Sequence, residues 1–160
     1  MGHADPRPQG LVHKLMPGDV VVAEQGEQLE TLLGSCVSII LTDPRRTIAA
    51  MCHVVHTGEA ADHHEPAAAW GEAAVQAMAD GLRQRGITLA LCEAFIFGGG
   101  NMFPTLDIPL TVGEDNAHWA IEAMARLRIR VVQSDLGGQV YRKVQWTVGP
   151  QAPVVQCVAI

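Results

Sequence analysis

Two apolar runs separated by a short polar turn constrain the fold of this 160-residue chain more than any other feature. The first run spans residues 31–41 and the second spans 47–55, with Asp43-Pro44-Arg45-Arg46 between them. Runs of Val, Ile and Leu at this length predict strands, and Asp followed by Pro is typical of a type I turn. The sequence therefore predicts an antiparallel hairpin in its first half.

The rest of the chain predicts further strands and two amphipathic helices. The main helix is expected over residues 65–85, because apolar positions recur there every fourth residue: Trp70, Ala74, Met78 and Leu82. A second helix is expected over residues 116–127, behind a cap at Asp115 or Asn116. Further strands are expected at 19–23, 87–97, 129–133, 140–148 and 154–160. We expect an α/β fold, a single-domain layered sandwich of mixed, mainly antiparallel β-sheet with two principal helices.

Composition narrows the class of protein. Eleven basic and 17 acidic residues give a net charge of −6, which argues against nucleic-acid binding. Residues 1–18 are rich in Gly, Pro and His and predict a flexible leader, with one domain over residues 19–160. The longest uncharged stretch, 31–42, is too short to span a membrane as a helix. The start of the chain has no apolar core typical of a signal peptide, and the four cysteines lack paired short spacings, so we expect a cytoplasmic protein with reduced thiols.

The predicted hairpin brings one cysteine opposite one histidine. If the turn is centred between residues 44 and 45, Cys36 and His53 lie equally far from it, with Cβ atoms about 4.5–5.5 Å apart. Cys52 must then point to the other face of the hairpin. A neighbouring imidazole can activate a thiol, and Thr31 is the nearest upstream group that could orient that imidazole. The N–H groups of Gly34-Ser35 are candidates for binding an oxyanion.

Four other interpretations, of these and of other residues, remain open at this point. Cys36 could be an ordinary core residue, or a zinc site could form from Cys52, His53, His56, His63 and His64. Gly98-Gly99-Gly100 could cradle a phosphate, but it lacks the Lys-Ser/Thr of a P-loop and favours a turn. A basic group near the C-terminus favours a solvated surface over a docking patch for an acidic partner: Arg126, Arg128, Arg130, Arg142 and Lys143.

Five segments then occur in a fixed order: TLLGSCVSIILTDP (31–44), AAMCHVV (49–55), FIFGGGNMF (95–103), VGEDN (112–116) and DLGGQVYRKVQW (135–146). Together they resemble the chemoreceptor glutamine deamidases of the CheD family over residues 18–160. The resemblance implies that Cys36 is the nucleophile, His53 the base and Thr31 the third member of a triad. No cofactor is implied.

The same resemblance implies a substrate and partners. The reaction would convert glutamine side chains on the cytoplasmic helices of methyl-accepting chemotaxis receptors to glutamate, with release of ammonia, during chemotaxis adaptation. A CheC-like chemotaxis phosphatase is the second partner that the resemblance implies. The alternative is a catalytically idle adaptor that binds the receptor or the phosphatase.

Overall fold

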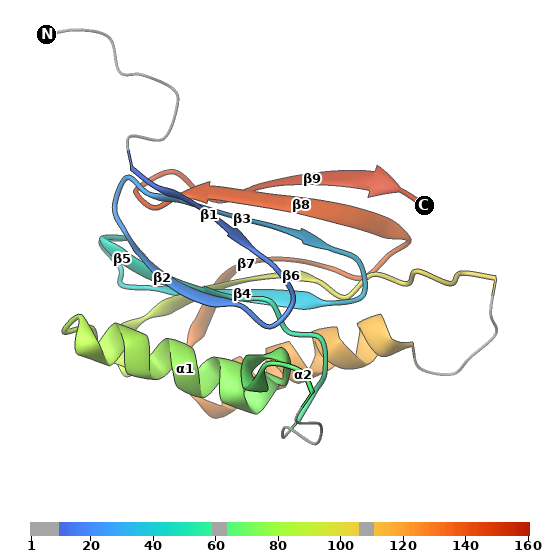
Figure 1. Ribbon diagram of the computed structural model, residues 1–160, viewed down its shortest axis with the longest axis horizontal. Coiled ribbons are helices and arrows are strands. Elements are labelled where there is room, and N and C mark those ends of the chain that lie inside the picture. The colour runs from blue at the N-terminus through green and yellow to red at the C-terminus, as the bar shows by residue number, and fades with distance from the viewer. Residues whose placement is uncertain (1–9, 59–63, 106–110) are drawn as a thin grey trace, which may run out of the picture.

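Two β-sheets lie face to face, and two helices cover the outer face of one of them, as Figure 1 shows. The computed structural model describes residues 10–58, 64–105 and 111–160. The four-stranded sheet has the order β1 (Val12–Leu15), β3 (Gln28–Leu33), β8 (Val140–Thr147) and β9 (Val154–Ala159). The five-stranded sheet has the order β2 (Val20–Glu24), β5 (Ile48–Cys52), β4 (Val37–Thr42), β6 (Glu93–Gly98) and β7 (Arg130–Leu136).

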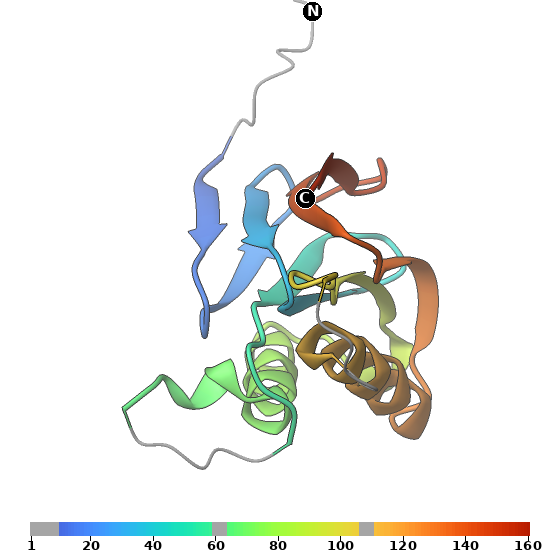
Figure 2. The ribbon, with the colours of Figure 1, turned by 90° about the vertical axis from the view of Figure 1, so that its right-hand side faces the viewer.

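Helices α1 (Gly71–Gln84) and α2 (Val112–Arg126) pack on the five-stranded sheet, and Figure 2 shows them side by side beneath it. Short 3₁₀ turns, η1 (Ala67–Ala69) and η2 (Leu89–Leu91), precede α1 and β6. The pairs β1/β3 and β6/β7 are parallel, and all other strand pairs are antiparallel. The expected α/β layered sandwich of mixed, mainly antiparallel sheets is therefore confirmed.

Strand β4 is buried on both faces because it lies between two apolar cores. Val37, Ile39 and Leu41 face the core beneath the helices, whereas Ile40 faces the core between the two sheets. A strand covered on both sides needs apolar residues at every position rather than at alternate ones. This requirement explains the continuous apolar run that dominates the sequence.

The predicted strand over residues 31–41 is two strands in different sheets. It breaks at residues 34–36, where the chain crosses from β3 in the four-stranded sheet to β4 in the five-stranded sheet. The expected strand over 87–97 is likewise divided, into η2 and β6. Both halves of each run are rich in apolar residues, so periodicity alone does not mark the break.

Three predicted boundaries also move. Residues 12–15, expected within the flexible leader, form β1 and pair with β3. Helix α1 begins at Gly71, after η1, rather than near residue 65. Helix α2 begins at Val112, because Thr111 accepts a hydrogen bond from Glu114 N and the Glu114 side chain accepts one from Thr111 N. This capping box replaces the expected cap at Asp115 or Asn116.

The hairpin register differs from the prediction by two residues. The expected turn is present, since Arg46 N donates to Asp43 O at 2.8 Å. However, Arg46 then adopts a left-handed conformation (φ 56°), and the Asp43 carboxylate accepts hydrogen bonds from the N–H groups of Thr47 and Ile48. Pairing resumes only at Thr42 with Ala49. The longer loop therefore moves Cys36 away from the position directly opposite His53.

None of the described helices combines the length and the apolar character needed to cross a bilayer.

Candidate active site

The loop that carries Cys36 is tied down by its backbone carbonyls. Gly34 O accepts from Gly100 N at 2.9 Å, and Cys36 O accepts from Gly99 N at 2.9 Å. A Cβ on Gly98 (φ 115°) would overlap the Cys36 carbonyl oxygen, so this close approach requires glycine. The glycines at 98–100 thus hold the cysteine loop in place through backbone hydrogen bonds and close packing. The N–H groups of Gly99 and Gly100 already donate to these carbonyls, so they cannot also bind the phosphate that the sequence allowed.

His53 and Thr31 come from different sheets and meet between them. The Thr31 Oγ1 lies 2.7 Å from His53 Nδ1 and donates to Leu15 O at 2.8 Å. A hydroxyl has a single hydrogen, so Thr31 must accept from Nδ1–H if it donates to Leu15. The imidazole is thereby held with Nδ1 protonated and Nε2 carrying the lone pair, which is the form that can accept a proton.

Cys36 and His53 project from the same face of the five-stranded sheet. Cys36 packs against the core between the sheets, and the contact of His53 with Thr31 places the imidazole there as well. Val37 bridges Val54, so Cys36 is one diagonal step from His53 instead of directly opposite. Diagonal neighbours in a regular sheet lie about 7–8 Å apart, within the range that longer side chains can bridge.

Cys52 points to the opposite face, as predicted. Its sulfur lies in the core beneath the helices, 3.4 Å from Ile39 N. Burial raises the pKa of this thiol to about 12, so it stays protonated and inert.

Burial keeps both members of the Cys36/His53 pair uncharged. It raises the pKa of the half-buried Cys36 thiol above its ordinary value. It also lowers the pKa of His53, although the negative charge of Asp19 and the backbone of Leu15 partly oppose this shift. At rest, Cys36 is therefore a thiol and His53 a neutral imidazole.

Asn116 is a buried polar residue whose position the sequence did not explain. It lies on α2, is 1% exposed, and its Nδ2 donates to Ser35 O at 3.0 Å and to Val55 O at 3.1 Å. One side chain thus joins the loop of Cys36 to the segment that follows His53. The only signal in the sequence was the VGEDN segment, which the resemblance includes without giving Asn116 a role.

Arg142 does not belong to the solvated surface expected for the basic group. It is 3% exposed, and its guanidinium donates to Asp135 Oδ1 at 3.0 Å, to Gly137 O at 2.6 Å and to Gly98 O at 3.3 Å. These bonds hold the ends of β6 and β7 together beside the cysteine loop. The residue is structural support for the site.

The described residues do not assemble the zinc site considered above. Cys52 and His53 point to opposite faces of the sheet, and His56 Nε2 lies 3.0 Å from Glu65. No cluster of three or more His, Cys, Asp or Glu side chains suited to a metal is found in the part of the chain that the structure describes. His63 lies outside the described residues.

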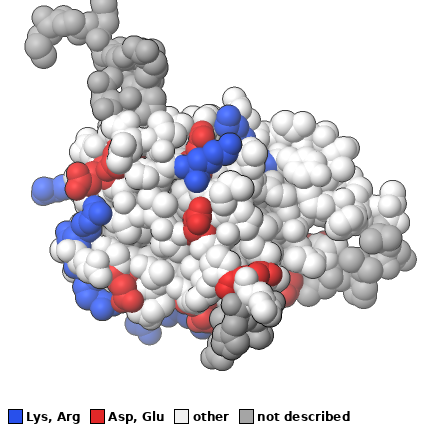
Figure 3. Space-filling view, in the orientation of Figure 1, with Lys and Arg blue, Asp and Glu red and all other residues white. Residues whose placement is uncertain are grey.

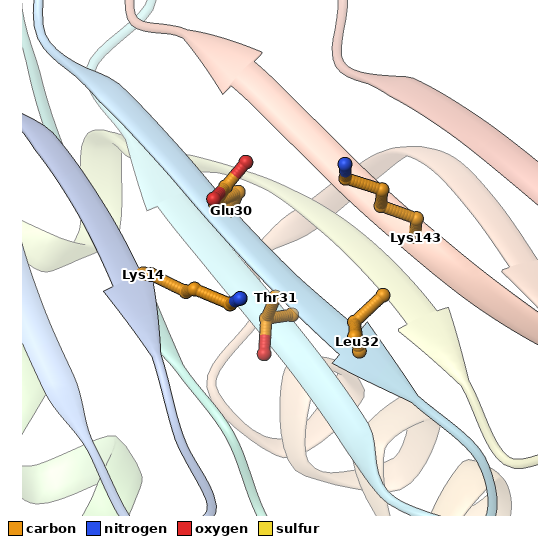
Figure 4. A pocket seen from close by; sticks show the side chains of 5 residues that line it. All are labelled: Lys14, Glu30, Thr31, Leu32 and Lys143. Atoms are coloured by element: carbon orange, nitrogen blue, oxygen red, sulfur yellow. The ribbon is translucent and has the colours of Figure 1, made fainter.

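Two hollows lie along β3 and the start of the cysteine loop, and neither includes Cys36 or His53 in its lining. Figure 4 shows a small pocket of about 60 Å³ beside Thr31, lined by Lys14, Glu30, Thr31, Leu32 and Lys143 from three strands. Its volume suits a few water molecules. A larger open groove of about 390 Å³ lies beside Gly34, lined by Leu32, Leu33, Gly34, Tyr141 and Arg142. This groove is large enough for a side chain of another protein.

Charge is sparse on the face seen in Figure 3. Charged side chains occur towards the left, along the lower edge and in a group of both signs near the upper middle, while much of the right-hand part, where Figure 1 places the β3–β4 crossover, is uncharged. The surroundings of the cysteine loop are thus mainly apolar or neutral in this view.

Comparison with known proteins identifies the family. A family model described as CheD chemotactic sensory transduction matches residues 56–153. A probable chemoreceptor glutamine deamidase CheD 2 of Albidiferax ferrireducens is 36% identical over 138 residues, 84% of this chain and 80% of that protein. Probable chemoreceptor glutamine deamidases CheD of Methanococcus maripaludis and Pseudomonas fluorescens are 27% and 30% identical, over 91% and 82% of this chain and 95% and 76% of their own lengths. The chain belongs to the CheD family.

Proposed function

We propose that this chain is a cysteine-dependent protein-glutamine deamidase that acts in the cytoplasm on methyl-accepting chemotaxis receptors. It converts glutamine side chains on the cytoplasmic receptor helices to glutamate and releases ammonia, which serves chemotaxis adaptation. The names of the relatives support the substrate, and the chemistry of Cys36, His53 and Thr31 supports the reaction.

The mechanism uses only groups of the chain. His53 Nε2 takes the proton of the Cys36 thiol as the sulfur attacks the amide carbon, and the imidazolium then protonates the departing ammonia. His53 next activates a water that hydrolyses the thioester and frees the product carboxylate. Because the resting pair is neutral, the proton moves during the attack rather than before it. No cofactor takes part.

One observation carries the proposal: the Thr31 hydroxyl bridges His53 Nδ1 and Leu15 O. That bridge selects the imidazole tautomer that a general base needs. A histidine that only filled the core would gain nothing from having Nε2 kept as the acceptor.

The groove beside Gly34 is the proposed docking site for the residues that flank the target glutamine. Its lining includes Leu32, Leu33 and Tyr141, which suit an apolar face of a receptor helix. We also propose a CheC-like phosphatase as a binding partner, which the family resemblance supports and which co-elution of the two purified proteins tests.

The test is conversion of amide to acid. Purified protein is incubated with receptor cytoplasmic fragments, and glutamine sites are mapped by mass spectrometry. The parent protein is expected to deamidate specific glutamines, and Cys36→Ala to abolish conversion without unfolding. Cys157→Ala is the matched control, because Cys157 is exposed on β9 and outside the site. Receptor binding without conversion by the parent protein would favour the idle adaptor instead.

A further inference from the structure

The peptide between Ser35 and Cys36 is held in one orientation by the side chain of a distant helix. Asn116 Nδ2 donates to Ser35 O and to Val55 O, and both acceptors are carbonyl oxygens. Only the NH₂ end of an amide can face two such acceptors. Because Asn116 is 1% exposed, water is poorly placed to substitute for these bonds.

The direction of the Ser35 carbonyl fixes the direction of the next N–H. A trans peptide is planar, so its C=O and the following N–H point in opposite directions. The described part of the chain contains no cis peptide bond. Asn116 approaches from α2, on the helix side of the five-stranded sheet, whereas the Cys36 side chain packs towards the other sheet. The Cys36 N–H is therefore turned towards the face that bears its own thiol.

That N–H is not consumed by other bonds of the loop. Cys36 O is paired with Gly99 N, and Val37 N is paired with Val54 O. Within residues 10–58, 64–105 and 111–160, no hydrogen bond is found from Cys36 N to an acceptor. A backbone N–H that is left available beside a nucleophile is the donor that stabilises an oxyanion in acyl transfer.

We propose that Asn116 is a positioning residue that turns the Cys36 N–H towards the oxyanion formed during deamidation. The inference rests on the proposed function. When Cys36 Sγ bonds to the amide carbon, the carbonyl electron pair moves to oxygen, and that oxygen accepts the hydrogen bond of Cys36 N–H. The C=O bond re-forms as the C–N bond breaks and ammonia leaves with a proton from His53. Asn116 touches no substrate atom.

The test compares chemistry that forms an oxyanion with chemistry that does not. Deamidation is measured as separate kcat and KM values, and alkylation of Cys36 by iodoacetamide reports the thiol alone, with Cys157→Ala as the common background. Asn116→Ala is expected to lower kcat about 100-fold, the scale of one lost oxyanion donor. KM should change less than about twofold, because Asn116 does not contribute to substrate binding in the ground state. The rate of Cys36 alkylation should stay within about threefold of that of the background protein.

Two variants guard against a purely structural effect. Met124→Ala opens a cavity elsewhere on α2 and is expected to destabilise the protein while leaving kcat unchanged. Asn116→Leu keeps a similar side-chain volume and has no donor, and it should lose kcat as Asn116→Ala does; it also serves if the alanine variant fails to fold.

The results separate this inference from the proposed function. A parent protein that converts no glutamine overturns both. An active parent with Asn116 variants whose kcat stays within about threefold overturns the inference alone. A loss of alkylation that parallels the loss of kcat also overturns it, because Asn116 would then act on the thiol rather than on the peptide.

Discussion

At the scale of single residues, burial decides the charge state of the pair. Both the thiol of Cys36 and the imidazole of His53 lose solvation, and each is pushed towards its neutral form. Within the part of the chain that the structure describes, no cation opposes this shift of the Cys36 pKa. A protein with this pair rests as thiol and imidazole, unlike cysteine enzymes that hold a thiolate–imidazolium pair.

The pH dependence of Cys36 alkylation distinguishes these two resting states. A thiol whose pKa is raised should react with iodoacetamide at a rate that is still rising at the ordinary cysteine pKa of about 8.5 and levels off only at higher pH. The acid limb of kcat/KM should have its midpoint below about 6.5, because the pKa of His53 is lowered and only the neutral imidazole acts as base. A flat alkylation rate from pH 5 upward would instead reveal a thiolate–imidazolium pair.

Protonation of His53 should also affect stability. The pKa of His53 in the fold lies below its value in the unfolded chain, so the unfolded state binds more protons as the pH falls. Stability contributed by the neutral imidazole is complete above about pH 6.5 and is lost as the pH falls towards the pKa in the fold.

Sequence reasoning reached some of these residues and missed others. Local spacing predicted the two faces of Cys36 and Cys52, because alternation along a strand is a local property. The sequence favours Asp115 or Asn116 as a helix cap, since a polar residue near a helix start has that role far more often than a contact with Ser35, 81 residues before Asn116. A contact between residues so far apart in the chain produces no periodic pattern in the sequence from which it could be predicted.

At the scale of elements, the loop between β4 and β5 sets the register on which the site depends. The carboxylate of Asp43 accepts from Thr47 N at 2.7 Å, from Thr47 Oγ1 at 2.8 Å and from Ile48 N at 3.0 Å. Burial alone would raise the pKa of Asp43, but these hydrogen bonds outweigh it and lower the pKa. The loop is thus specified by one side chain.

Asp43→Ala tests this role. Loss of the acceptor leaves two backbone N–H groups of the loop without their partner, so the free energy of unfolding should fall by about 1–3 kcal/mol. Urea denaturation measures the change, and Asp80→Ala, at an exposed ion pair on α1, provides a control expected to cost less than about 1 kcal/mol. Equal losses for the two variants would contradict the assignment.

Element prediction succeeded where periodicity was strong and failed at sheet boundaries. The apolar residues at every fourth position are buried, as expected: Trp70, which directly precedes α1, and Ala74, Met78 and Leu82 within it. The run over 31–41 gave no sign that it changes sheets, because Gly34 and Ser35 interrupt it without breaking its apolar character. The predicted hairpin register was wrong because Arg46 adopts a left-handed conformation, which makes the loop longer than the type I turn that the sequence predicts.

At the scale of the whole molecule, the helices and the two sheets form three layers that enclose two apolar cores, and the two cores differ in their exposure to solvent. The core beneath the helices buries Cys52 and Cys92, whereas the core between the sheets is open to solvent at Cys36. Strand β1 completes the second core through Leu15, whose carbonyl also anchors Thr31. Composition near the N-terminus gave no hint of this, because a short edge strand needs few apolar residues.

The layers predict which thiols react. Burial raises the pKa of Cys52 to about 12 and, together with the charge of Asp43, that of Cys92 to about 11. The folded protein should therefore be labelled by a neutral thiol reagent at Cys157 and, more slowly, at Cys36, and all four cysteines should be labelled in urea. Peptide mapping identifies the sites, and rapid labelling of Cys52 in the fold would contradict the layer assignment.

The account depends most on the tautomer that Thr31 imposes on His53. Nitrogen-15 NMR of the imidazole at neutral pH reads it directly: a protonated Nδ1 with an unprotonated Nε2 is expected in the parent protein and in Thr31→Ser, which keeps the hydroxyl. Thr31→Val should lose this preference, and its kcat should fall roughly 10- to 100-fold. A parent protein with Nε2 protonated and Nδ1 bare would contradict the account, because His53 could not then accept the proton of Cys36.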